Sequence, residues 1–164
     1  MSQMFFAKVQ ELCPNAADRM IGYSESEIEK LERLYGIQLS GDFRAFMERA
    51  GRCDGGIIGD DPFIIYRPHW SVRTHILFQV NFFSSLQAIG AWDYLDRVFV
   101  FSVESETQYY FLQTGAAEPD LVYHYDENSE SVKATGMRFG EYLVDVLARY
   151  PHGRGLCKGE LLNI

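Results

Sequence analysis

The sequence predicts one α+β domain, in which a twisted, mainly antiparallel sheet is flanked by N-terminal helices and by one C-terminal helix. The chain has 164 residues, a length that commonly forms a single hydrophobic core. Apolar residues follow a helical period up to about residue 50 and again near the end, whereas the middle holds short runs of β-branched and aromatic residues. Helices first, then strands, then a helix indicate an α+β arrangement rather than alternating β–α–β units.

Three helices are expected in the first third of the chain. The first covers residues 2–12, where apolar side chains recur at helical spacing. The second begins after Ser24, because Ser24 and Glu27 form the S-x-x-E pattern of a capping box, and Gly36 fits the left-handed position that ends many helices. The third covers about residues 40–50, where two phenylalanines, a methionine and an alanine share one face.

The middle of the chain is expected to form strands and the end a helix. Five runs are predicted as strands: residues 63–67, 76–80, 98–103, 108–113 and 121–126. Turn-rich segments separate the last three, which indicates an antiparallel meander. The predicted helices are a short one at residues 84–95 and a closing one at residues 138–150. The tail, residues 152–164, contains three glycines, a composition that favours partial mobility.

Composition and charge narrow the classes of function. The formal net charge is −8, from 15 basic and 23 acidic residues, and aromatic residues make up 15%. A strongly acidic domain repels phosphate groups, so we expect a basic protein partner rather than nucleic acid or an anionic membrane. The chain shows neither a signal peptide nor a transmembrane run. It has three cysteines, whereas a secreted disulfide framework usually has an even number. We therefore expect a cytoplasmic protein with reduced thiols.

The distribution of acidic residues points to a binding surface. Between Arg97 and Lys133 the chain carries seven Asp and Glu residues and neither lysine nor arginine. Such a stretch either keeps exposed turns solvated or presents a negative surface to a basic partner, with aromatic side chains as anchors. The residues predicted to contact a partner are Asp54, Asp60, Asp61, Trp70, Glu104, Glu106, Tyr109, Glu118, Asp120 and Asp126, with Trp92 and Tyr123 as further aromatic candidates.

Catalytic and metal-binding motifs are weak. Segment 51–61 is rich in glycine but lacks the Lys-Ser/Thr of a phosphate loop and carries three aspartates, so we interpret it as a turn after a helix. Residues 126–137 lack the glycine and the final glutamate of a calcium loop. The histidines and cysteines show no zinc spacing, and no motif supports a dyad of Cys53 with a distant histidine. We expect no catalytic residue, metal or cofactor.

One segment carries a family pattern. Residues 28–40 read Ile-Glu-Lys-Leu-Glu-Arg-Leu-Tyr-Gly-Ile-Gln-Leu-Ser, and Asp-Phe-Arg-Ala-Phe-Met follows at 42–47, before Gly51 and the pair Gly55-Gly56. This pattern resembles the SUKH superfamily, whose usual sequence is I-x-x-L-E-x-x-x-G-x-x-L-P-x-D-[FY]-x-x-F-L with a glycine-rich turn after it. Ser40 stands where the superfamily has proline, and the asparagine expected before the glycines is absent. Later segments also look like its strands and closing helix, so the resemblance spans roughly residues 20–150.

The resemblance implies a binding fold rather than an enzyme. The superfamily includes yeast cell-wall-assembly regulators, the SecY-interacting protein Syd and many bacterial toxin-immunity proteins. Together with the acidic and aromatic residues, it leads us to predict a cytosolic immunity protein of the antitoxin type that binds a toxin domain such as a basic nuclease. The alternatives are an intracellular regulatory or scaffold module and, less favoured, a small enzyme.

Overall fold

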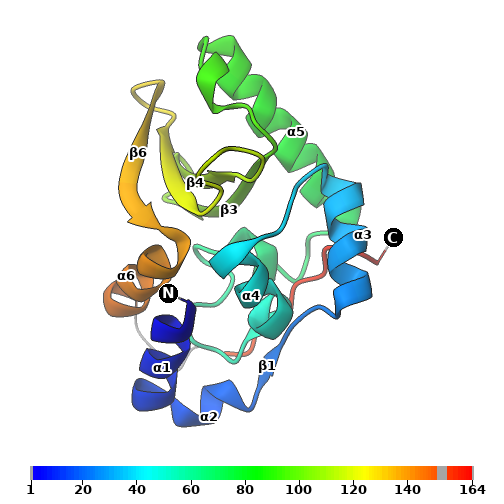
Figure 1. Ribbon diagram of the computed structural model, residues 1–164, viewed down its shortest axis with the longest axis vertical. Helices are drawn as coiled ribbons and strands as arrows, with labels where there is room; N and C mark the ends of the chain where they lie inside the picture. Colours follow the sequence, from blue (N-terminus) through cyan, green and yellow to red (C-terminus); the bar gives the residue numbers. More distant parts are fainter. Residues whose placement is uncertain (1, 151–154, 164) are drawn as a thin grey trace.

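The computed structural model describes residues 2–150 and 155–163, and Figure 1 shows their arrangement. Four antiparallel strands form the large sheet, in chain order: β3 (Val98–Glu104), β4 (Gln108–Gln113), β5 (Leu121–Asp126) and β6 (Ser131–Arg138). A small antiparallel pair joins β1 (Met20–Ile21) to β2 (Cys53–Asp54). The predicted α+β fold with a meander is therefore confirmed.

Helices cover both faces of the large sheet (Figure 1). Helix α5 packs on one face and α4 and α6 pack on the other, with α1 against α4 and α6 and with α3 against α4. In the described residues the helices are α1 (Ser2–Leu12), α2 (Pro14–Ala17), α3 (Glu25–Tyr35), α4 (Gly41–Ala50), α5 (Val72–Ala88) and α6 (Phe139–Arg149), with two 3₁₀ turns, η1 (Ile64–Tyr66) and η2 (Trp92–Tyr94). The capping box before α3 is present, and its C-cap Gly36 has a φ of 64°, as the sequence predicts.

Alternation along the strands divides the apolar side chains between two cores. Phe99 and Phe101 of β3 belong to the larger core, with residues of α1, α4 and α6. Val100, between them in sequence, belongs to the smaller core, together with Phe82 and Leu86 of α5. The sheet is thus the middle layer of the molecule. The alternation in β3 is interrupted by a register shift between Val100 and Ser102, after which Val103 also belongs to the smaller core.

Helical spacing in the sequence predicts that six side chains join the N-terminal helices to the closing helix in one core: Leu31, Leu34, Phe43, Phe46, Leu143 and Leu147. All but Leu34 are buried and belong to the larger core. Leu34 differs, because it is half-buried at the edge of a surface pocket. The amphipathic spacing of α3 therefore predicts the buried face of this helix correctly, except that it also assigns Leu34 to that face.

Two of the predicted strands are wrong. Residues 63–67 contain η1, and only Phe63 forms a bridge, to Ser102. Residues 76–80 lie inside α5, which begins after Ser71, whose Oγ accepts a hydrogen bond from the N–H of Thr74 at 3.2 Å. A short apolar run with aromatic neighbours fits a buried strand and a buried helix equally well, so periodicity did not distinguish them.

One helix and one strand also differ from the sequence prediction. Helix α5 ends at Ala88 and η2 follows at Trp92–Tyr94, so the helix expected at residues 84–95 is only the last turn of α5 plus a separate 3₁₀ turn. Strand β6 was not predicted. It forms one edge of the sheet, and its largely exposed side chains give it a weak apolar pattern.

The described part of the C-terminal tail is tied to the domain. Leu161 is buried, its N–H donates to Tyr23 Oη at 3.2 Å, and its carbonyl accepts from Tyr35 Oη at 2.8 Å. The backbone N–H of Gly159 donates to the carbonyl of Arg52 at 3.0 Å. Gly159 and Leu161, in the tail expected to be mobile, are therefore held against α3 and the small sheet, whereas Gly155 and Leu156 are exposed. Residues 152–154 and 164 of the predicted tail lie outside the described structure.

Candidate protein-binding surface

Two turns of the large sheet lie side by side and gather acidic residues. The N–H of Glu127, in the β5–β6 turn, donates to the carbonyl of Thr107, in the β3–β4 turn, at 2.9 Å. Asn128 Nδ2 donates to Thr107 Oγ1 at 3.1 Å. This end of the sheet therefore carries Glu106, Asp126, Glu127 and Glu130.

A loop before η1 brings further carboxylates to the same end. The carbonyl of Pro62 accepts a hydrogen bond from the N–H of Val103 at 3.1 Å, so the loop runs along the edge of β3. A pocket of about 250 Å³ opens there, which we call the acidic pocket. Its lining consists of Asp60, Asp61, Arg67, Pro68, His69, Trp70 and Glu106. Four residues that the sequence predicts as partner contacts thus line one pocket, to which residues 60–70 contribute three and the β3–β4 turn contributes Glu106.

Trp70 is the first of four aromatic side chains that lie in a row. Its ring centroid lies 5.1 Å from that of Phe78, which lies 6.1 Å from that of Tyr109. Tyr109 in turn lies 5.6 Å from Tyr125. We call Trp70, Phe78, Tyr109 and Tyr125 the aromatic row; the first three are half-buried and the last is buried. The row runs from the acidic pocket to a smaller hollow of about 80 Å³ lined in part by Glu127.

The aromatic row is joined to the acidic turns by a hydrogen bond. Tyr109 Oη donates to Glu127 Oε2 at 3.1 Å. Burial, followed by the hydrogen bond to Glu127, raises the pKa of Tyr109 to about 12. The phenol therefore remains a proton donor at physiological pH and holds one carboxylate beside the row.

Arg67 is the basic side chain in the acidic pocket. Its Cζ lies 4.8 Å from the centroid of the Trp70 ring, and its Nη2 lies 3.9 Å from Glu106 Oε1. Its Nε donates to the carbonyl of Asp60 at 3.5 Å. Arg67 and Phe78 are not among the predicted contacts, because the prediction selects acidic residues and a few aromatic ones. The proximity of Arg67 to Trp70 in sequence is the available signal.

Three of the predicted contacts lie elsewhere. Glu104 faces α6, where its Oε1 lies 3.1 Å from Arg149 Nη2 and its side chain is 16% exposed. Glu118 and Asp120 belong to the β4–β5 turn, at the opposite end of the meander. Glu118 pairs with Arg138 at 3.0 Å, and Asp120 lies against the start of α4, where burial raises the pKa of its carboxyl group.

Asp54 is completely buried, and its carboxylate is hydrogen-bonded to backbone groups of the loop that follows it. Its two carboxylate oxygens accept hydrogen bonds of 2.6 to 3.2 Å from four successive backbone N–H groups, those of Gly56, Ile57, Ile58 and Gly59. The glycine-rich segment is therefore a nest of N–H groups that is filled by the preceding aspartate. A partner surface has no access to this carboxylate, which does not belong to the candidate surface.

Asp126 lies at the acidic end but stabilises its own turn. Its Oδ1 accepts from Gln108 Nε2 and from the N–H of Asn128, both at 2.9 Å. The hydrogen bond from Gln108, more than any other effect, lowers the pKa of Asp126. Asp126 therefore adds negative charge to this end of the sheet, although its Oδ1 already accepts two hydrogen bonds within the protein.

The residues considered for catalysis have other partners. Cys53 is buried, and its Sγ accepts from the N–H of Gly55 at 3.4 Å. His124 Nε2 lies 2.6 Å from Gln108 Oε1, and burial lowers the pKa of this histidine. In the residues that the structure describes, no three His, Cys, Asp or Glu side chains come together as a metal site.

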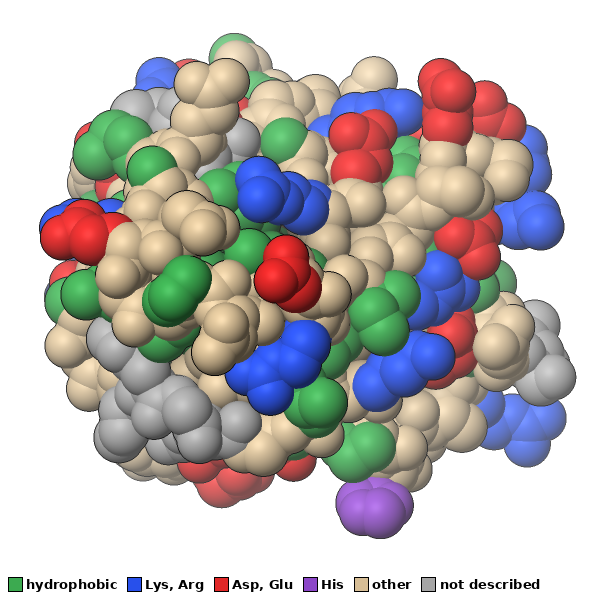
Figure 2. Space-filling view, turned by 90° about the horizontal axis from the view of Figure 1, so that it is seen from below, with side chains coloured by type: hydrophobic (Ala, Val, Ile, Leu, Met, Phe, Trp, Pro, Cys, Tyr) green, Lys and Arg blue, Asp and Glu red, His purple; other side chains and the backbone are tan. Residues whose placement is uncertain are grey.

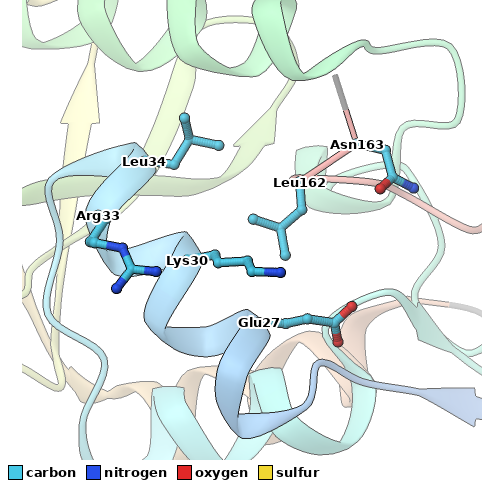
Figure 3. A pocket seen from close by; sticks show the side chains of 6 residues that line it. All are labelled: Glu27, Lys30, Arg33, Leu34, Leu162 and Asn163. Carbon is cyan, nitrogen blue, oxygen red and sulfur yellow. The ribbon is translucent and has the colours of Figure 1, made fainter.

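A larger pocket, of about 400 Å³, lies between α3 and the C-terminal segment (Figure 3). Its lining is Glu27, Lys30, Arg33, Leu34, Leu162 and Asn163, none of which is a predicted contact. Figure 2 views the molecule from the side of α1, α2 and β1, and there basic and acidic side chains intermingle. Among the described helices, none combines the length and the apolar character needed to cross a membrane.

Comparison with known proteins agrees with this architecture. The chain matches the family model SUKH_6, described as SMI1-KNR4 cell-wall, over residues 25–143, which run from α3 to α6 and include the acidic pocket and the aromatic row. A search of curated proteins found no match. The matched segment contains α3, the nest that follows Asp54 and the whole meander. The protein therefore belongs to the SMI1-KNR4 family of the SUKH superfamily.

Proposed function

We propose that this protein is an immunity protein of the antitoxin type, which binds and neutralises a basic toxin domain without catalysing a reaction. The observation that carries the proposal is that the acidic pocket and the aromatic row share Trp70. Tryptophan and tyrosine often dominate binding energy, and carboxylates at a rim speed the encounter with a basic partner. A nuclease fits this description, because its substrate groove must attract phosphates.

We also propose that the protein acts in the cytoplasm. Cys13, Cys53 and Cys157 are all free thiols, and Cys53 is buried. Unpaired cysteines are typical of proteins in reducing compartments.

The proposal is tested by neutralisation. The protein would be co-expressed with a toxin domain encoded beside its own gene, or with a basic protein that it captures at low ionic strength, and the activity of that partner would be measured. We expect the wild-type protein to inhibit at equimolar ratio and a folded Trp70→Ala variant to inhibit much less.

Glu118→Gln, at the opposite end of the sheet, is the control and should inhibit like the wild-type protein. Binding that leaves the partner's activity unchanged would overturn the proposal in favour of a regulatory or scaffold module. Turnover of a substrate by the purified protein would overturn it in favour of an enzyme.

A further inference from the structure

Arg67 is held in the acidic pocket by contacts that are all long. The nearest carboxylate oxygen, Glu106 Oε1, lies 3.9 Å from its Nη2, and the hydrogen bond to the carbonyl of Asp60 measures 3.5 Å. Glu106 itself is 85% exposed. The guanidinium lies over the Trp70 ring at 4.8 Å, within the range of a cation–π interaction.

A second arginine shows how this fold holds a structural guanidinium. Arg52 pairs with Glu27 at 2.9 Å and with Glu160 at 3.1 Å, and it lies 4.1 Å from the centroid of the Tyr23 ring. Its side chain is 13% exposed, against 20% for Arg67. Both arginines combine carboxylates with an aromatic ring, but only Arg52 has the short hydrogen bonds that lock its position.

We propose that the acidic pocket is a receptor site for an arginine side chain of the partner, and that Arg67 occupies it until the partner displaces it. This inference rests on the proposed function and specifies the chemistry of its central contact. The incoming guanidinium takes the place of Arg67 over Trp70 and forms the short hydrogen bonds to Glu106 that Arg67 does not form. A planar guanidinium suits such a site better than an ammonium group, because it stacks on a ring and binds a carboxylate with two N–H groups.

The contact predicts an unusual response to mutation. Removing Arg67 takes away a side chain that lines the binding surface, yet affinity should rise, because the unoccupied site no longer has to be vacated. In the free protein, Arg67 makes a weak stacking and ion-pair contact that the partner has to break. Without this competing contact, the partner should bind about threefold to tenfold more tightly. If Arg67 instead contacts the partner, its removal weakens binding.

The experiment uses the full chain in a Trp92→Phe background, which leaves Trp70 as the single tryptophan. Trp92 is 63% exposed in η2, so its replacement should leave the fold intact. The probe is N-acetylated triarginine amide, titrated at low ionic strength while Trp70 fluorescence is followed, with trilysine and tricitrulline amides as comparison peptides. We expect triarginine to bind more tightly than trilysine and tricitrulline not to bind.

Two variants and two matched controls separate the contact from general electrostatics. Arg67→Ala should tighten triarginine binding and Glu106→Gln should weaken it by about tenfold. Arg138→Ala and Glu118→Gln make the same charge changes in a pair at the other end of the sheet, where Arg138 lies 3.0 Å from Glu118. Both should leave Trp70 binding unchanged. Equal effects of Arg67→Ala and Arg138→Ala, or equal affinity for the lysine peptide, would overturn the inference.

The peptide-binding experiment and the neutralisation test can fail separately. A protein that neutralises its toxin with unchanged potency in the Arg67→Ala and Glu106→Gln variants retains the proposed function and lacks the arginine site. A protein that binds triarginine as described but neutralises no toxin has the site without that function.

Discussion

Arg52 donates two hydrogen bonds to the carboxylate of Glu27, at 2.9 and 3.0 Å. The same carboxylate accepts from the N–H of Ser24 at 2.8 Å and so caps α3. Arg52 also reaches Glu160 at 3.1 Å, which connects the helix cap to the C-terminal segment. One ion network therefore holds together three segments that are far apart in sequence.

This network predicts an acid-sensitive contribution to stability. Hydrogen bonding to Arg52, above all, lowers the pKa of Glu27 from 4.5 to about 2. A carboxyl group with a lowered folded-state pKa stabilises the protein above its unfolded pKa, and this contribution is lost as the pH falls from about 4.5 to about 2. Glu27→Gln should therefore cost about 1 kcal/mol at pH 7 and progressively less below pH 4.5, as measured by urea unfolding. An equal cost at pH 7 and pH 2.5 would contradict this.

The burial of His75 predicts a second pH range in which stability changes, above the range of Glu27. The side chain is buried on α5, its Nε2 has no hydrogen-bond partner among the described residues, and burial, with the nearby Arg67, lowers its pKa from 6.5 to about 4. The unfolded chain takes up the proton first, so this residue should make stability decrease as the pH falls from 6.5 towards 4. A His75→Leu variant should lack that decrease in thermal unfolding measured between pH 7 and pH 4.5; if it keeps the full decrease, His75 is not its source.

Phe46 should be the most costly aromatic residue to truncate in α4. It is completely buried, and the rings of Phe5, Phe63 and Phe139 surround it at centroid distances of 5.9, 6.2 and 5.4 Å. Phe46→Ala should lower the free energy of unfolding by about 3–5 kcal/mol, the usual cost of a large cavity. Leu77→Ala on the exposed face of α5 should change it by no more than about 0.5 kcal/mol. Chemical denaturation of both variants checks the contrast.

Asp54 should matter for folding rather than for binding. Replacing it with alanine leaves four buried N–H groups without their acceptor, and hydrogen bonds to a charged group contribute about 1.5–3 kcal/mol each. We expect Asp54→Ala to lose at least about 3 kcal/mol of stability or to fail to fold. A stable Asp54→Ala protein with impaired partner binding would show instead that the carboxylate reaches the partner.

Association with a basic partner should depend on salt and on Glu106 more than on Glu104. Glu106 is exposed at the acidic pocket, whereas Glu104 pairs with Arg149 and is largely covered. Glu106→Lys should slow association, because rim charges mainly affect the on-rate, while Glu104→Lys should mainly reduce stability. On-rates measured at low and high ionic strength test this, since surface charges are screened beyond about 8 Å at physiological salt. An on-rate that does not respond to salt would leave the acidic surface with a role in solubility alone.

The sequence by itself determined the local features of this protein. The capping box at Ser24 and Glu27, the left-handed Gly36, the α4 and α6 stripes and the three closely spaced strands all depend on residues within a few positions of one another. Family membership also followed from these local patterns, because the resemblance lies in helix, cap and turn residues.

The tertiary structure alone decided which face each apolar run occupies and which charged residues meet. Segment 76–80 became part of α5 because a helix there covers the second face of the sheet. The acidic pocket combines a loop, the residues before α5 and the β3–β4 turn, and Asp54 turned inward because the following loop wrapped its N–H groups around it. The α5 packing and the acidic pocket depend on contacts between residues far apart in the chain, about which local propensity carries no information. The partners of Asp54 are only two to five residues away, but the burial of that loop is decided by the surrounding fold.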